Sequence, residues 1–229
     1  MQNLSRGKES KGKQSQYTGQ PLKINESYIK ERVKRIVDLL ISIPLVVFLS
    51  PVFLFIALLI KIESPGPVFF TQKRRGINFT HFTIIKFRSL LQNAPDPHEK
   101  YEMLKKDPRI TRIGNFIRKT SIDELPQLFN VIIGTMSMVG PRPLVEWESK
   151  LALSNFPERY NVKSGITGLS QVSGRNAIDF NTRCALDVEY VRKRSTLLDL
   201  LLILKTPYVL LTSGEIYPTE ESKNIAANK

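Results

Sequence analysis

The sequence is poor in the side chains that usually hold metals or form covalent cross-links. Among 229 residues there is one cysteine, Cys184, and there are two histidines, His81 and His98. A single cysteine excludes an internal disulfide and a cysteine-based zinc site, and two scattered histidines are too few for a histidine metal cluster. Acidic residues are scarce beside basic ones, with 21 Asp and Glu against 34 Lys and Arg, a net charge of +13. This excess indicates an anionic partner: nucleic acid, an acidic membrane surface or a phosphorylated substrate.

Residues 1–28 have few apolar side chains and are rich in Gln, Ser, Gly and Lys, which predicts a disordered basic arm. Its only aromatic side chains are Tyr17 and Tyr28, so the arm offers no stacking platform for nucleic acid. It leads directly into the most apolar segment of the chain. We therefore expect anionic membrane lipids as its partner, and no nucleic acid.

Residues 39–60 form an uncharged run of 22 residues, long enough for a straight helix to span the hydrocarbon core. Basic residues flank the run on both sides, and the positive-inside rule places both flanks in the cytoplasm, which a single span cannot satisfy. Proline at Pro44 and Pro51 removes helical hydrogen bonds, and Ser50 can bond a carbonyl that is freed. A re-entrant helix broken at Ser50-Pro51 is favoured over a spanning helix and over an ordinary core helix, with residues 29–62 as the membrane anchor.

A β-hairpin is predicted after the turn-rich residues 63–67, with strands at 68–71 and 80–87 and a turn at 75–78. Lys86 and Arg88 are two positions apart, so on a strand they project from the same face. Two adjacent cations are either solvated at an edge or hold an anion. The pattern leaves both readings open.

Two amphipathic helices are predicted on either side of an acidic pair. The first opens at Asp107-Pro108, and its apolar face consists of Ile110, Ile113, Phe116 and Ile117. The second carries Leu125, Leu128, Phe129 and Ile132 at helical spacing, with Gly134 as its stop. Ser121 and Glu124 match the capping-box pattern at its start, which places Asp123 in the first turn.

Asp123 has two readings at this point. Acidic residues are common at helix starts simply because they complement the helix dipole. Alternatively, the dipole and Arg118 keep Asp123 ionised beside a phosphate site, as an aspartyl-phosphate nucleophile requires. A divalent metal would then offset the charge of a carboxylate that meets a pyrophosphate.

Arg142 lies between two prolines in Gly140-Pro141-Arg142-Pro143, so its backbone freedom is small and its guanidinium suits bidentate phosphate contact. Residues 165–168 and 173–175 form a Gly-rich loop that ends in Arg175. The loop matches neither the Walker A motif nor the dinucleotide-binding fingerprint.

Several motifs occur in a fixed order along residues 32–211. They are Lys34-Arg35 with Asp38, Ser50-Pro51, S-P-G-P-V-F-F at 64–70, K-F-R-S at 86–89, I-R-K-T-S-I-D-E-L-P-Q-L at 117–128, M-S-M-V-G-P-R-P at 136–143, and G-I-T-G-L with Q-V-S-G-R at 165–175. This series closely resembles the bacterial sugar transferase family, the monotopic polyprenyl-phosphate phosphoglycosyl transferases. Two positions depart from the family pattern: Ser164 replaces a usual proline, and Ser170 a common tryptophan or alanine.

The resemblance implies a specific reaction. Such enzymes transfer a sugar-1-phosphate from a UDP-sugar to undecaprenyl phosphate, release UMP and start a lipid-linked surface glycan. It implies that Asp123 is the covalent nucleophile and a ligand of Mg²⁺, and that Glu124 supports the second half-reaction or the metal. It also implies that five basic residues bind substrate, namely Lys86, Arg88, Arg118, Arg142 and Arg175.

The resemblance also implies a location and an architecture. We expect a mixed α/β, predominantly helical fold with a small β-hairpin or sheet, amphipathic interfacial helices and a re-entrant motif of Lys34, Arg35, Asp38, Ser50 and Pro51. The catalytic domain would occupy residues 63–211 on the cytoplasmic face of the bacterial inner membrane, followed by a polar tail at 212–229. Whether a homodimer forms is left open, as are the sugar and the glycan.

Two rival functions are distinguishable in principle. A sugar-transferring glycosyltransferase would release UDP and form no phosphoenzyme. A basic membrane-anchored scaffold or nucleic-acid binder would retain its binding when Asp123 is replaced by Asn.

Overall fold

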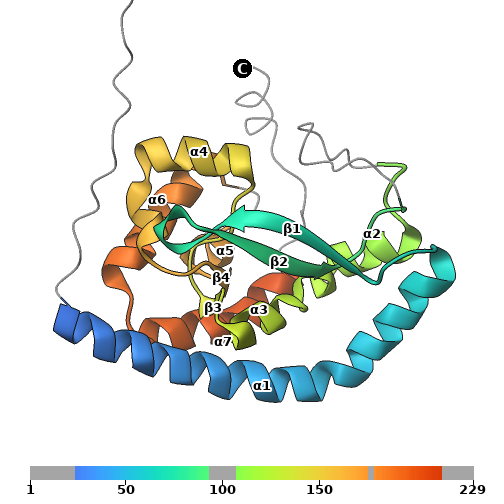
Figure 1. The fold of residues 1–229 in the computed structure, drawn as a ribbon, viewed down its shortest axis with the longest axis horizontal. Helices are drawn as coiled ribbons and strands as arrows, with labels where there is room; N and C mark the ends of the chain where they lie inside the picture. Colours follow the sequence, from blue (N-terminus) through green and yellow to red (C-terminus); the bar gives the residue numbers. More distant parts are fainter. Residues whose placement is uncertain (1–23, 93–106, 175–177, 213–229) are drawn as a thin grey trace, which may run out of the picture.

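The apolar N-terminal segment forms one long helix, α1 (Ile24–Glu63). The computed structural model describes residues 24–92, 107–174 and 178–212, with side chains from residue 31 onward. Figure 1 shows α1 as a curved helix that runs along one side of the molecule, with the remaining elements on its concave side. The predicted basic arm and the polar tail lie outside the described residues, apart from the first turn of α1 and Thr212.

The helix is continuous across Ser50-Pro51, so the predicted break is not an interruption of the helix. Pro51 has no N–H to donate to the carbonyl oxygen of Val47, four residues earlier. Ser50 Oγ donates to that oxygen at 2.8 Å. The serine hydroxyl thus replaces the missing backbone donor, which allows helical geometry to continue through the proline.

The predicted hairpin is confirmed. Strand β1 (Phe69–Arg75) pairs antiparallel with β2 (His81–Phe87), with Phe69 opposite Phe87. The first strand extends four residues beyond its predicted end at 71, and a 3₁₀ turn, η1 (Ile77–Phe79), closes the hairpin. The longer strand matters for the site because it extends the pairing that fixes β2.

The segment around the acidic pair differs from its prediction. Helix α2 (Arg112–Lys119) begins five residues later than expected, capped by Thr111, whose hydroxyl accepts from the N–H of Gly114 at 2.8 Å. Asp107 instead accepts hydrogen bonds from the backbone and side chain of Arg109. The preference of aspartate for such a local turn explains the later start.

The predicted capping box is not formed. Ser121 has φ 58°, and its side chain makes no capping hydrogen bond. Residues Ile122–Glu124 form a separate 3₁₀ turn, η2, and α3 (Gln127–Ile133) starts after Pro126. Asp123 therefore lies in η2, before α3, while the predicted stop at Gly134 is confirmed by its φ of 94°.

A second, parallel sheet of two strands joins distant parts of the chain. Strand β3 (Ser137–Val139) pairs with β4 (Gly165–Thr167). Residues 165–167 were expected to be part of a Gly-rich loop, but they form this strand. Gly165 is needed for close packing, because a Cβ atom there would lie 2.0 Å from the backbone nitrogen of Gly140. Helix α5 (Leu169–Val172) follows.

The remaining elements surround this sheet. They are α4 (Glu146–Asn155), η3 (Pro157–Asn161), α6 (Phe180–Lys193) and α7 (Thr196–Thr212). Helices α6 and α7 contain the apolar stretches 186–191 and 197–211 of the sequence. The described chain is mostly helical with a small β part, as the sequence predicts.

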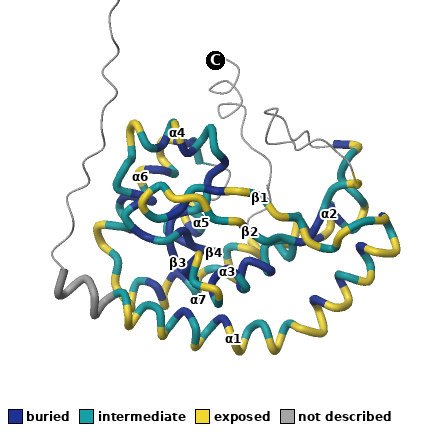
Figure 2. Tube along the Cα trace, in the orientation of Figure 1, coloured by how far each residue is buried: buried dark blue, intermediate teal, exposed yellow. Residues whose placement is uncertain are grey.

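One face of α1 belongs to the hydrophobic core, and the opposite face is exposed. Phe53, Ile56 and Ile60 are buried against residues of the hairpin and α3, whereas Phe48 is 79% exposed and Leu54 73%. Figure 2 shows the exposed positions repeating along α1. Helix α7 also exposes large apolar side chains, including Leu197, Leu204 and Leu211. Within the described ranges, α1 is the one helix whose length and composition suffice to cross a membrane, over Glu31–Glu63.

Candidate active site

Two predicted substrate-binding cations, Lys86 and Arg142, meet at the carboxylate of Glu124, which is also a predicted site residue. Lys86, near the end of β2, donates to Glu124 Oε1 at 2.8 Å. Arg142, in the loop after β3, donates to the same oxygen at 3.0 Å and to Oε2 at 3.4 Å. The Glu124 side chain is 17% exposed. A single carboxylate therefore fixes two cations that come from different parts of the sequence.

The loop that carries Arg142 is fixed by the parallel sheet. The N–H of Gly140 donates to the carbonyl oxygen of Thr167 at 2.9 Å, and the N–H of Gly165 donates to that of Pro141 at 3.0 Å. These bonds tie the residues that follow β3 to both ends of β4. Arg142 is thus presented by a loop in which backbone pairing and two prolines both restrict movement.

Asp123, the neighbour of Glu124, lies in a field of mixed sign. Burial raises the pKa of Asp123 to about 6, an effect that the positive charges of Lys86, Arg118 and Arg142 oppose and the negative charge of Glu124 reinforces. At neutral pH the carboxylate is largely ionised but unusually easy to protonate. A partly buried carboxylate beside several cations is suited to attack a phosphate whose charge those cations offset.

Glu124 behaves oppositely. Burial acts to raise its pKa, but the charges of Arg142 and Lys86 and their hydrogen bonds outweigh burial, so the pKa lies well below its usual range. Glu124 is therefore ionised at all physiological pH values. In this geometry it holds the two cations in place and has no proton to donate.

One of the predicted substrate-binding cations, Arg88, does not join this cluster. The guanidinium of Arg88, although near Lys86 in sequence, donates to the carbonyl oxygens of Ser64 at 2.7 Å and Pro65 at 2.6 Å. It is buried, and it holds the turn that follows the carboxyl end of α1. Arg175 lies outside the described residues. Arg118, in the last turn of α2, lies near enough to Asp123 for its charge to lower the pKa of that carboxyl.

The donor set fits a magnesium ion only if substrate supplies further ligands. Among the residues that the structure describes, no group of three or more His, Cys, Asp or Glu side chains gathers. Mg²⁺ commonly binds one or two carboxylates together with substrate phosphates. Since Glu124 is paired with Lys86 and Arg142, Asp123 is the carboxylate that would hold the ion.

The predicted re-entrant motif joins α1 to the rest of the protein. Lys34 pairs with Asp199 of α7 at 2.7 Å. Arg35 donates to the carbonyl oxygens of Val131 and Ile132 at 2.5 and 2.7 Å, which caps the carboxyl end of α3. Asp38 accepts from Ser137 Oγ at 3.0 Å and from the N–H of Met138 at 2.9 Å. All three charged side chains are therefore used in docking α1.

The carboxyl end of α1 is hydrogen-bonded to the start of α2, which precedes α3 in the chain. The carboxylate of Glu63 accepts from the N–H groups of Arg112 at 2.6 Å and Ile113 at 2.9 Å, at the start of α2. Arg35 holds the end of α3. The segment α2–η2–α3, which carries Asp123, is thus fixed to α1 at both of its ends, and Figure 1 shows α2 beside the carboxyl end of α1.

Comparison with known proteins identifies the family. The model of the family described as bacterial sugar transferase matches residues 29–213. The chain is 41% identical over 196 residues to the exopolysaccharide production protein ExoY of Sinorhizobium fredii, covering 79% of this chain and 87% of the relative. The chain belongs to the bacterial sugar transferase family, a family of transferases, as the order of its motifs implies.

Two longer relatives are named for a reaction. The undecaprenyl-phosphate glucose phosphotransferase of Komagataeibacter xylinus is 41% identical over 184 residues, covering 76% of this chain and 35% of the relative. The undecaprenyl-phosphate galactose phosphotransferase of Salmonella typhimurium is 39% identical over 199 residues, covering 81% of this chain and 42% of the relative. This chain therefore matches less than half of each of these two proteins.

Proposed function

We propose that this protein transfers a sugar-1-phosphate from a UDP-sugar to undecaprenyl phosphate and so starts a lipid-linked surface glycan. The names of the relatives support the acceptor and the type of group transferred. The observation that carries the proposal is the placement of Asp123, a partly buried carboxylate whose pKa is affected by Lys86, Arg118 and Arg142. Such a site can bring a carboxylate and a diphosphate together without prohibitive repulsion.

In the first half-reaction, a carboxylate oxygen of Asp123 attacks the phosphorus that bears the sugar. The bond from that phosphorus to the bridging oxygen of UMP breaks, and UMP leaves with the electron pair. The product is an aspartyl phosphosugar. Lys86, Arg118 and Arg142 stabilise the negative charge that develops on the phosphate oxygens. Bound Mg²⁺ would supply further neutralisation of the diphosphate.

In the second half-reaction, a phosphate oxygen of undecaprenyl phosphate attacks the same phosphorus. The bond to Asp123 breaks, the carboxylate is regenerated, and a lipid diphosphosugar is released. The donor is soluble and the acceptor is embedded in lipid. A nucleophile that carries the phosphosugar between them can act on one after the other, which suits a site beside a membrane helix.

The membrane arrangement is part of the proposal. We infer that α1 enters the cytoplasmic leaflet of the bacterial inner membrane with its exposed apolar face and returns to the same side. The exposed apolar side chains of α1 and α7 support contact with lipid. The bonds of Lys34 and Glu63 hold the two ends of α1 to the same body of the protein, which is easier to reconcile with a return than with a full crossing.

The experiment is nucleotide analysis with a panel of UDP-sugars, undecaprenyl phosphate and Mg²⁺, using the wild type and Asp123→Asn. We expect UMP from at least one donor and no release by the variant. Release of UDP would instead indicate transfer of the sugar alone and would contradict the proposal. Absence of release with every donor would contradict it as well, provided that the protein is folded.

A further inference from the structure

A buried ion pair lies behind the loop that carries Arg142. Arg159 of η3 and Asp187 of α6 are 2% and 1% exposed, and Nη2 of Arg159 donates to Asp187 Oδ2 at 2.7 Å. The same Nη2 donates to the backbone carbonyl oxygen of Arg142 at 2.8 Å. Neither residue attracts attention in the sequence, because they are 28 positions apart and belong to no recognised motif.

The pair is itself held from both sides. Asp187 Oδ1 accepts a hydrogen bond from Ser170 Oγ at 2.6 Å. Arg159 Nη1 donates to the hydroxyl of Tyr160 at 3.2 Å, and that hydroxyl donates to the carbonyl oxygen of Ser149 at 3.1 Å. The guanidinium therefore has one orientation, and its contact with the Arg142 carbonyl is fixed.

Fold stability alone is a weak reason for such a pair. Removing two charges from water is costly, and apolar residues of similar volume often replace a buried pair without loss of stability. The contact to Arg142 supplies a different reason. Arg159 holds the backbone carbonyl of Arg142, and the guanidinium of Arg142 contacts Glu124.

We propose that Arg159 is a positioning residue, which acts through the backbone of Arg142 to keep its guanidinium on Glu124 and beside Asp123. The role of Arg159 in catalysis rests on the proposed function. The effect of Arg159 on the charge around Asp123 is independent of that function, so the two are tested separately.

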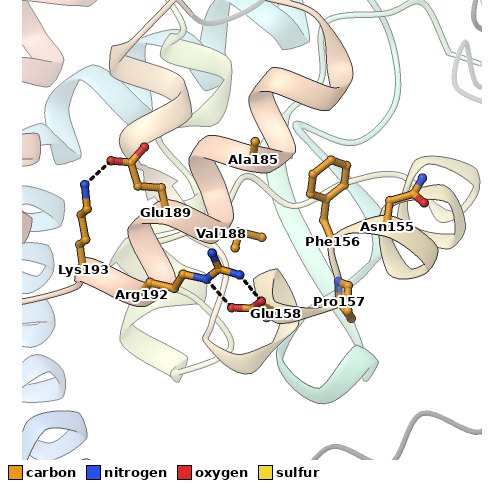
Figure 3. Close-up of a pocket in the computed structure, with 9 residues that line it drawn as sticks. All are labelled: Asn155, Phe156, Pro157, Glu158, Ala185, Val188, Glu189, Arg192 and Lys193. Carbon is orange, nitrogen blue, oxygen red and sulfur yellow. Dashed lines mark hydrogen bonds and ion pairs between the residues drawn. The ribbon is translucent and has the colours of Figure 1, made fainter.

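The test variant replaces the whole pair, Arg159→Met with Asp187→Leu. This removes the bond to the Arg142 carbonyl without leaving a buried charge unpaired, and Ser170 retains Gln171 Oε1 as an acceptor at 3.0 Å. The matched control is Glu158→Leu with Arg192→Met. Figure 3 shows this second pair, which also joins η3 to α6 but lies at the surface.

The first measurement does not depend on activity. The titration of Asp123 is followed by carboxyl ¹³C NMR in full-length protein labelled at aspartate, with assignment by Asp123→Asn. The charged groups known to act on Asp123 are Lys86, Arg118 and Arg142, which are positive, and Glu124, which is negative. If Arg142 moves away, we expect the midpoint to rise by about half a pH unit, since a nearby cation favours the ionised form. The control should keep the wild-type midpoint.

The second measurement is the rate of phosphosugar adduct formation at saturating donor. We expect this rate to fall about tenfold in the test variant, because a positioning contact is lost. The melting temperature should change little. An unchanged midpoint of Asp123 in a folded test variant would overturn the inference, whatever the activity. If the wild type forms no adduct with any donor, the proposed function fails, and the midpoint still decides the positioning role.

If the double variant does not fold, Arg159→Lys is titrated instead. Its shorter, single ammonium should release the Arg142 carbonyl and raise the midpoint, and a wild-type midpoint would contradict the inference.

Discussion

Asp123 and Glu124 are neighbours in the sequence, yet their surroundings affect them in opposite directions. Glu124 forms direct ion pairs with Lys86 and Arg142, which keep it ionised. Asp123 feels the same cations less strongly than it feels burial, so its pKa rises to about 6. The difference separates two tasks: one carboxylate organises the cations, and the other remains available to react.

The raised pKa of Asp123 predicts an acid limb in the pH dependence of the reaction. Only the ionised carboxylate attacks phosphorus, so kcat/KM should be nearly constant above pH 7 and fall about tenfold per pH unit below a midpoint near 6. The measurement is initial-rate kinetics from pH 5 to 8 with a donor that the wild type uses. A flat profile down to pH 5 would contradict the role of Asp123 as the titrating nucleophile.

The same pKa makes a prediction about stability. Because the pKa of Asp123 in the folded protein, about 6, exceeds its ordinary value of 3.8, ionisation costs the folded state more than the unfolded one. Its contribution to stability is therefore highest below pH 4 and is lost as the pH rises to 6. Asp123→Asn should raise the free energy of unfolding at pH 7.5 by at most about 3 kcal/mol, since one pKa unit corresponds to about 1.4 kcal/mol. The melting temperature at this pH should rise with it.

A matched substitution has the opposite sign. The hydrogen bond from Arg109 lowers the pKa of Asp107, so Asp107 contributes stability above its ordinary pKa and loses it as the pH falls. Asp107→Asn should therefore lower the melting temperature at pH 7.5. A loss of stability for both variants at this pH would refute the electrostatic account of Asp123.

At the scale of elements, α1 fixes the segment that bears the nucleophile. Glu63→Gln weakens its hydrogen bonds to the amino end of α2, and removing a capping interaction of this kind typically costs about 1 kcal/mol. We expect slower turnover, because the position of Asp123 depends on α2. The measurement is kcat in the same membrane mimetic for both proteins.

The control for this prediction is Arg194→Gln. Arg194 pairs with Glu31 near the amino end of α1, away from the end that Glu63 joins to α2. It should lose a comparable surface contact and keep the wild-type kcat. Equal effects of the two substitutions would show that α1 contributes only general stability.

The elements also show which features can be predicted from a sequence. The hairpin, α2 and α3 follow from strand composition and helical spacing, which are local signals. The capping box at Ser121 and Glu124 was wrong because Glu124 is recruited by two cations from distant segments. The β4 strand was missed because a strand of three residues containing a glycine has almost no local signature. Its pairing with β3 depends on contacts between residues far apart in the chain.

The candidate site, like the fold, was predicted only in part from the sequence. Motif resemblance singled out Lys86, Arg142 and the acidic pair, which the fold brings together. It also included Arg88, whose hydrogen bonds go instead to the carbonyl oxygens of Ser64 and Pro65, in the turn after α1. Arg159 was missed, because a buried residue that acts through a neighbour's backbone leaves no spacing pattern.

At the scale of the whole molecule, the re-entrant arrangement predicts that both ends of α1 face the cytoplasm. Single-cysteine labelling can test this, since Cys184 is buried and burial raises the pKa of its thiol to about 12, which makes it unreactive. Arg32→Cys and Lys61→Cys place thiols at exposed positions near either end. In intact cells, a membrane-impermeant maleimide should label neither, and both should react after the membrane is opened. Labelling of one position in intact cells would show that α1 crosses the membrane.

The central claim is that Asp123 becomes covalently attached to the phosphosugar, and intact mass spectrometry tests it most directly. The full-length protein is incubated with a UDP-sugar that supports turnover and Mg²⁺, without lipid acceptor, and is then measured under denaturing conditions. We expect a mass increase equal to one sugar-phosphate on the wild type, its loss on adding undecaprenyl phosphate, and none on Asp123→Asn. A wild-type protein that releases UMP in full turnover but never carries the adduct, or an adduct that persists in Asp123→Asn, would contradict the account.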